Sequence, residues 1–147
     1  MFIHEMFQQK PCVFSVEVFP PKKAGAAEET LYPVLRELCT LGPDYISVTY
    51  GAGGGTAGQS TAKIASYIKN GLHVEALAHL TCVNSTRVQV EETLTRLRED
   101  NVENVLSCPA RGYQPGSAAP DGFPACERPC KSHCADRRLR RGRCVLS

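Results

Sequence analysis

The sequence predicts an α/β fold built on a parallel sheet. Four short runs rich in β-branched and aromatic residues alternate with three stretches whose apolar residues recur at helical spacing. The resulting order is βαβαβαβ, and strands joined in this way by helices form parallel sheets with right-handed crossovers. These patterns lie in residues 1–106 of the 147-residue chain.

The first strand and helix are expected at residues 12–19 and 27–40. The strand is rich in Val and Phe, and a Pro pair stops it. Pro33 is tolerated only in the first turn of a helix, so the helix should begin close to Thr30. One helical face then carries Leu31, Leu35, Leu38 and the nearby Val34.

The later units follow the same plan. Residues 44–50 form a strand, and the helix at 57–69 ends at Asn70-Gly71, a C-terminal cap signal. Its inward residues should be Thr61, Ile64, Ala65 and Ile68. A strand at 74–81 leads to a helix at 87–100, which begins with a capping box formed by Thr86 and Gln89. The apolar stripe of this helix consists of Val90, Leu94 and Leu97, and a fourth strand begins at Asn104-Val105-Leu106.

An ionisable side chain interrupts the first strand. Glu17 lies within FSVEVFPPK, residues 14–22, a run that otherwise predicts a buried strand. Burying an unpaired carboxylate is costly, so its pKa usually rises, and a raised pKa is what a general acid needs. Alternatively, the carboxylate reaches solvent past the Pro pair. This segment alone does not decide between the two.

Two further segments place polar residues at strand ends. Residues 44–56 run from a strand into a glycine loop, where the backbone can approach a ligand closely. They do not match a Rossmann fingerprint, because Thr56 stands where that motif needs Gly, and a plain strand-to-helix turn is the alternative. Residues 75–83 carry His79 near their end. A lone His of this kind is more often a hydrogen-bonded core residue than a site residue.

In this order and spacing, the three segments resemble methylenetetrahydrofolate reductase, a flavin-dependent barrel enzyme. The resemblance spans about residues 12–106 and rests on FSVEVFPPK at 14–22, SVTYGAGG at 47–54, AHLTC at 78–82 and ENVL at 103–106. It implies that the sheet is the N-terminal part of a (β/α)8 TIM barrel, with about three and a half βα units. In such barrels the chemistry lies at the C-terminal ends of the strands.

The resemblance also implies roles for five residues. Glu17 resembles the acid that protonates the folate nitrogen. The residues that resemble the family's flavin contacts are Thr49, Tyr50, Ala52 and His79. The implied reaction is the FAD-dependent reduction of 5,10-methylenetetrahydrofolate to 5-methyltetrahydrofolate, with NADH or NADPH as reductant. Its implied partner is a folate substrate, with no nucleic acid, membrane or metal, and a homo-oligomer stays open for intact family members.

The resemblance stops after the fourth strand. There the family carries an Ala-Leu-Arg-Gly-Asp segment that contributes to flavin and substrate binding, whereas residues 107–115 read SCPARGYQP. Residues 107–147 also hold five of the ten prolines and five of the eight cysteines. Net charge changes from −3 in residues 1–106 (9 basic, 12 acidic) to +5 in residues 107–147 (8 basic, 3 acidic). We therefore expect a partial barrel domain, 1–106, and an irregular, disordered tail, 107–147.

A change of reading frame accounts for this tail. When codons compatible with Cys108 onward are read from their second base, they permit Ala-Leu-Arg-Gly-Asp-Ile-Asn-Pro-Glu, which restores the missing motif. From Phe123 the same frame permits Phe-Arg-His-Ala-Ser-Asp-Leu-Val-Lys-Ala-Ile, which resembles the family's next segment. Two ordered matches in one frame indicate that the chain is frameshifted from about residue 107.

Other interpretations of the tail give it a function of its own. Cys126, Cys130, His133, Cys134 and Cys144 could bind zinc, although structural zinc sites usually pair two knuckles across a loop. The arginine-rich run at 137–143 could bind nucleic acid. The alternative class is therefore a non-enzymatic half-barrel remnant or a small basic binding protein.

Length and location complete the sequence predictions. Nothing in the sequence resembles a signal peptide, so the chain is expected to be cytoplasmic without a disulfide scaffold. A complete barrel takes about 250 residues, so this truncated sheet cannot close, its edges invite aggregation, and the chain is expected to be inactive.

Overall fold

The protein folds as a sheet covered by helices. The computed structural model describes residues 1–21, 26–50, 57–81, 87–108 and 144–146. The strands stand side by side in the order of the chain: β1 (Ser15–Val18), β2 (Tyr45–Val48), β3 (Glu75–Thr81), β4 (Asn104–Cys108) and β5 (Cys144–Leu146). The pairings from β1 to β4 are parallel, which confirms the predicted α/β sheet, and β5 joins β4 antiparallel.

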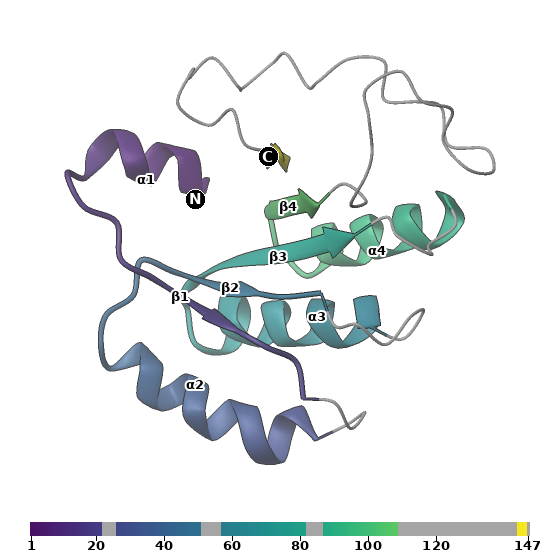
Figure 1. Ribbon diagram of the computed structural model, residues 1–147, viewed down its shortest axis with the longest axis horizontal. Coiled ribbons are helices and arrows are strands. Elements are labelled where there is room, and N and C mark those ends of the chain that lie inside the picture. The colour runs from purple at the N-terminus through teal and green to yellow at the C-terminus, as the bar shows by residue number, and fades with distance from the viewer. Residues whose placement is uncertain (22–25, 51–56, 82–86, 109–143, 147) are drawn as a thin grey trace.

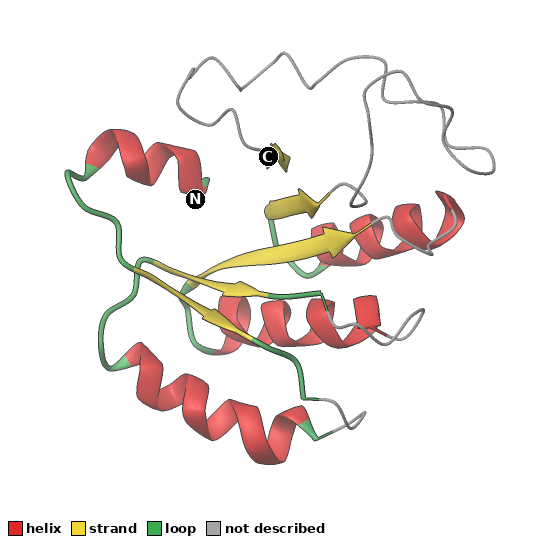
Figure 2. Ribbon diagram, in the orientation of Figure 1, coloured by secondary structure: helices red, strands yellow, loops and turns green. Residues whose placement is uncertain are grey.

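Three helices cover one face of this sheet, and a fourth lies on the other face (Figure 1). The covering helices are α2 (Tyr32–Cys39), α3 (Ala57–Ser66) and α4 (Arg87–Glu99), and the separate helix is α1 (Ile3–Gln9). Two π-helical turns extend this set: η1 (Ala27–Leu31) precedes α2, and η3 (Tyr67–Gly71) continues α3. Figure 2 shows the strands and helices alternating, as the sequence predicts for βα units.

The predicted helix boundaries agree with the structure in most places. Pro33 lies in the first turn of α2, as expected, although a π-helical turn already forms before it. The extension of α3 through η3 ends at Gly71, where the cap signal stands. The capping box proposed for α4 depends on Thr86, which lies outside the described residues.

The main core fills the space between the sheet and α2, α3 and α4. All four inward residues predicted for the helix at 57–69, which the structure divides into α3 and η3, are buried. Leu97 of α4 is buried beside the partly buried Val90 and Leu94. Leu35 is fully buried, but Val34 is 46% exposed, so its assignment to the core face was wrong. Val34 lies at the margin of the stripe formed by Leu31, Leu35 and Leu38, and among the described helices α2 has a neighbour only on its α3 side.

A smaller core lies on the opposite face, under α1, a helix that the sequence did not predict. Ile3 and Met6 of α1 pack against Leu77 of β3 and Leu106 of β4. The buried side chain of Asn104 accepts a hydrogen bond from the Ile3 N–H at 2.9 Å. This bond satisfies one of the unpaired donors at the helix start, so α1 is held on the sheet by packing and by a buried polar contact.

A second polar contact fixes the chain between α1 and β1. The Asp44 carboxylate accepts hydrogen bonds from the Lys10 ammonium and from the Phe14 N–H, the latter at 2.8 Å. The Asp44 N–H in turn donates to the Phe14 carbonyl at 2.7 Å. The Lys10 hydrogen bond, followed by that from Phe14, lowers the pKa of Asp44.

Replacing Asp44 by Asn should loosen this connection. At neutral pH we expect several-fold faster hydrogen exchange at the Phe14 amide, while Glu37→Gln, at an exposed carboxylate of α2, should change nothing there. Because folding lowers the pKa of Asp44, its stabilising effect is complete above the ordinary Asp pKa of about 3.9 and is lost as pH falls through the lowered value. Unchanged exchange in Asp44→Asn would show that the carboxylate does not hold the segment.

No helix in the described ranges is both long and apolar enough to cross a membrane.

Candidate active site

The sheet face opposite α2, α3 and α4 carries three of the five predicted site residues, Glu17, Thr49 and His79, in two rows. In the first row, Glu17 is in register with Ser47, Ser47 with Leu77, and Leu77 with Asn104. In-register residues of neighbouring strands point to the same face. Leu77 and Asn104 both contact α1, whereas Val18 and Val48 belong to the main core. Glu17 and Ser47 therefore lie on the face that the three covering helices leave free.

The second row lies two residues further along the strands. His79 is in register with Leu106, and Thr49 continues the alternation of β2. Pairing extends past the end of β2, since the Thr49 N–H donates to the Val18 carbonyl at 3.0 Å. Thr49 and His79 are both half-buried. The two rows bring Glu17, Thr49 and His79 to one face near the C-terminal ends of β1, β2 and β3, the place where βα barrels carry their chemistry.

The structure corrects the expectation that Glu17 is buried. Its side chain is exposed, and within β1 only the neighbouring Val18 is buried. The reason is the position of β1, which is an edge strand of the described sheet and pairs with β2 alone. Val16 and Val18 point toward the covering helices, so the intervening Glu17 points to the open face. Of the two readings of this segment, the solvent-reaching carboxylate is the one observed.

The remaining predicted flavin contacts are placed differently. The Tyr50 ring packs against the main core on the helix side, away from the face that carries Thr49. The backbone at Thr49 is tied to α3, because the Thr61 hydroxyl donates to the Thr49 carbonyl at 3.1 Å. Ala52 lies outside the described residues. The structure thus gathers three of the five predicted side chains and sets the Tyr50 ring apart from them.

Two residues of this region were missed by the sequence analysis. Ser47 is 7% exposed and lies directly beside Glu17 in register, where its hydroxyl donates to the Val16 carbonyl at 3.4 Å. Phe19, two residues after Glu17, is 70% exposed. The period-2 alternation of residues 44–50 could have placed Ser47 and Thr49 on one face. Nothing local to the sequence marks Phe19 as exposed.

The residues on this face fit part of a flavin site. Thr49 supplies a hydroxyl and His79 an imidazole, two groups that can hydrogen-bond the polar edge of a planar ring, while Leu106, in register with His79, is buried under α1. Ligand sites of this kind combine a mainly apolar lining with a few polar groups that fix orientation. The face could therefore form one wall of a flavin pocket.

A metal site has no support within the described part of the chain, where no group of three His, Cys, Asp or Glu residues could hold an ion. The zinc candidates Cys126, Cys130, His133 and Cys134 lie outside that part. The arginine-rich run at 137–143 also lies outside it.

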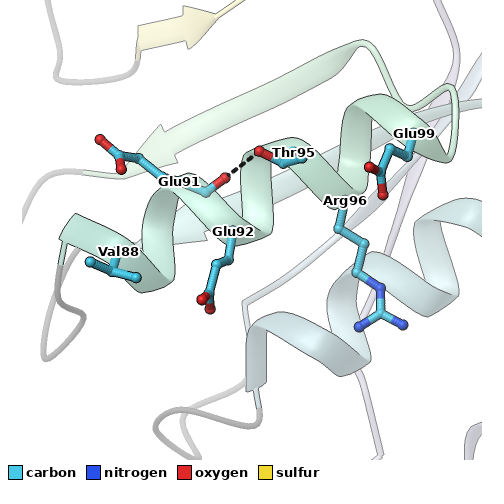
Figure 3. A pocket seen from close by; sticks show the side chains of 6 residues that line it. All are labelled: Val88, Glu91, Glu92, Thr95, Arg96 and Glu99. Atoms are coloured by element: carbon cyan, nitrogen blue, oxygen red, sulfur yellow. Dashed lines mark hydrogen bonds between the residues drawn. The ribbon is translucent and has the colours of Figure 1, made fainter.

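A shallow hollow is present on α4 (Figure 3), one of the helices on the sheet face opposite the predicted site. Its lining comes from this one helix: Val88, Glu91, Glu92, Thr95, Arg96 and Glu99. The Thr95 hydroxyl donates to the Glu91 carbonyl at 2.9 Å, a contact within the helix itself. The residues are mostly charged and lie on the side of α4 away from Leu97 in the core, so we interpret the hollow as a solvated helix face.

Comparisons with known proteins agree with the motifs. A sequence model of the methylenetetrahydrofolate reductase family matches residues 2–120. The chain is similar to "Methylenetetrahydrofolate reductase (NADH) 1" of Arabidopsis thaliana, at 36% identity over 105 residues, 71% of this chain and 17% of the relative.

Bacterial proteins named "5,10-methylenetetrahydrofolate reductase" are also similar. The Pectobacterium carotovorum relative is 34% identical over 73% of this chain and 37% of its own length. The Escherichia coli relative is 32% identical over 74% of this chain and 36% of its own length. The chain therefore spans about a sixth of the plant relative and little more than a third of the bacterial ones.

Proposed function

The chain belongs to the methylenetetrahydrofolate reductase family, and from this premise we propose that residues 1–106 form the first part of an FAD-dependent reductase barrel. The proposed reaction reduces 5,10-methylenetetrahydrofolate to 5-methyltetrahydrofolate, with NADH or NADPH as the reductant. The observation that carries the proposal is the placement of Glu17, Thr49 and His79 on one sheet face at the C-terminal ends of successive strands. The name of the Arabidopsis relative, which includes NADH, supports a nicotinamide reductant.

Glu17 is proposed as the group that gives a proton to the folate nitrogen. Its exposed carboxyl lies on the open face, where a substrate could approach it directly. To hold a proton near neutral pH, however, a carboxyl needs an apolar or enclosed environment. We propose that bound substrate and the remaining barrel strands enclose Glu17, with the neighbouring Ser47 limiting where the carboxyl can turn.

Thr49 and His79 are proposed to orient the flavin on the same face, together with the backbone near Tyr50 and Ala52. The attachment of Thr49 to both Val18 and Thr61 holds this strand end in place, which suits a positioning role. When bound, FAD would supply the hydride chemistry, as cofactors do for reactions that side chains cannot perform. The protein residues then bind, orient and donate the proton.

The DNA that encodes the chain provides the first test of this proposal. We expect the reading frame shifted after codon 107 to encode Ala-Leu-Arg-Gly-Asp and to continue through further βα units. Joining that continuation to residues 1–106 should give a yellow protein with NAD(P)H-dependent reductase activity. Codons incompatible with this motif, or a restored protein that lacks flavin, would overturn the proposal. Stoichiometric zinc in the 147-residue chain would instead favour a binding protein that acts through its tail.

A further inference from the structure

The outer edge of β4 is occupied by the chain's own C-terminal residues. β5 pairs with β4 in antiparallel register, with Val105 opposite Leu146, Leu106 opposite Val145, and Ser107 opposite Cys144. Figure 1 shows this short strand beside β4, at the end of the sheet away from β1. The pairing was not expected, since the tail carries no strand-like pattern that the sequence analysis detected.

The environment of β4 explains why this edge needs a neighbour. Val105 is 6% exposed on the helix side, and Leu106 is 5% exposed on the side of α1, so both faces of the strand are covered. β3 takes one of its edges. The other edge would present a row of unpaired N–H and C=O groups to solvent, which is a template for pairing with another chain.

β5 occupies the edge of β4 at which a continuing barrel would add its next strand, and it runs in the opposite direction. β1 to β4 all run parallel, and a continuing βα barrel would add a further parallel strand next to β4. The antiparallel β5 fills the same hydrogen-bonding edge, and one edge can pair with one strand at a time. We propose that residues 144–146 act as an edge-capping strand, which closes β4 to other strands, and that without them this edge pairs with β4 of a second copy of the chain.

The proposal reverses one expectation drawn from composition alone. By composition alone, residues 107–147 add five cysteines and a net charge of +5, and their removal is expected to improve solubility. If β5 caps the edge, removal instead exposes β4 and favours association. The short length of β5, three residues, is typical of edge strands that do not themselves recruit partners.

Cross-linking tests the register directly in the full chain. Ser107→Cys places a thiol opposite the native Cys144, and opposed residues in an antiparallel pair have Cα atoms close enough for a disulfide. Mild oxidation should give a 107–144 disulfide within one chain, identified by peptide mass spectrometry. Glu103→Cys, just before β4, should not link to Cys144. A Ser107→Cys protein that forms no such link, or links only between chains, would overturn the pairing.

Proline substitution tests the consequence of the pairing. In an antiparallel ladder alternate N–H groups of a strand point toward its partner, so one of the two variants Val145→Pro and Leu146→Pro removes an N–H that faces β4. Val145→Thr keeps the N–H and the strand propensity and serves as the matched control. In one of the proline variants we expect at least about tenfold faster hydrogen exchange at β4 amides that point toward β5. Amides that point toward β3 should stay protected. The same proline variant should form concentration-dependent oligomers in light scattering, whereas unchanged exchange and unchanged mass in both proline variants would show that β5 caps nothing.

Discussion

Replacing Glu17 by Gln in the restored, complete reductase should slow folate reduction by about 10²- to 10⁴-fold, the usual contribution of a general acid. Gln keeps the size of the side chain and its ability to hydrogen-bond, but it cannot give up a proton. Reduction of the enzyme by NADH or NADPH should proceed at its normal rate, because that half-reaction needs no proton on the folate nitrogen. Stopped-flow absorbance of the two half-reactions measures each separately.

The control for this variant is Glu37→Gln, which removes an exposed carboxylate on α2, a helix on the opposite side of the sheet. Both half-reactions should survive in that protein. Equal losses in the two half-reactions of Glu17→Gln would show that Glu17 serves the fold or flavin binding. The acid role would then be wrong, although the family assignment would stand, because it rests on the sequence match over residues 2–120.

The elements of the sheet and its covering helices could be predicted because their signals are local. In α3 and its continuation η3, the spacing of Thr61, Ile64, Ala65 and Ile68 indicates which side faces the core, and all four are buried. The strand order follows from βα connections, which place successive strands side by side. For these elements the local pattern and the tertiary packing favour the same structure.

The missed features depend on partners that are distant in sequence. α1 offers only Ile3 and Met6 to a core, and its attachment comes from Asn104, about a hundred residues away. Exposure of Glu17 follows from the edge position of β1, which depends on the whole sheet rather than on residues 14–22. β5 forms by pairing with the edge of β4 that β3 leaves free, so residues 144–146 alone do not predict it. The candidate site combines both kinds of information. The order of the motifs predicted Glu17, Thr49 and His79 as site residues, whereas packing against the core determines where the Tyr50 ring lies.

A polypeptide of these 147 residues should bind FAD weakly and show no reductase activity. Thr49 and His79 form at most one wall of the proposed pocket. Residues 107–115 contain Arg111-Gly112 but no Asp, so the Arg-Gly-Asp segment that the family resemblance assigns to flavin and substrate is incomplete. Hydrogen bonds to charged groups contribute about 1.5–3 kcal/mol each. The loss of one such bond would weaken binding by about 10- to 10²-fold.

Equilibrium titration of the purified chain with FAD, followed by flavin fluorescence, measures this affinity, and the restored protein serves as the positive control. The occupied β4 edge strengthens the expectation, because a further parallel strand cannot pair there while β5 is in place. Ending the chain at Cys108 should leave flavin binding weak and, by freeing that edge, should increase association. A stoichiometric yellow cofactor in the 147-residue chain that is lost on this truncation would show the opposite: the tail would then complete a functional site, and the frameshift interpretation would be wrong.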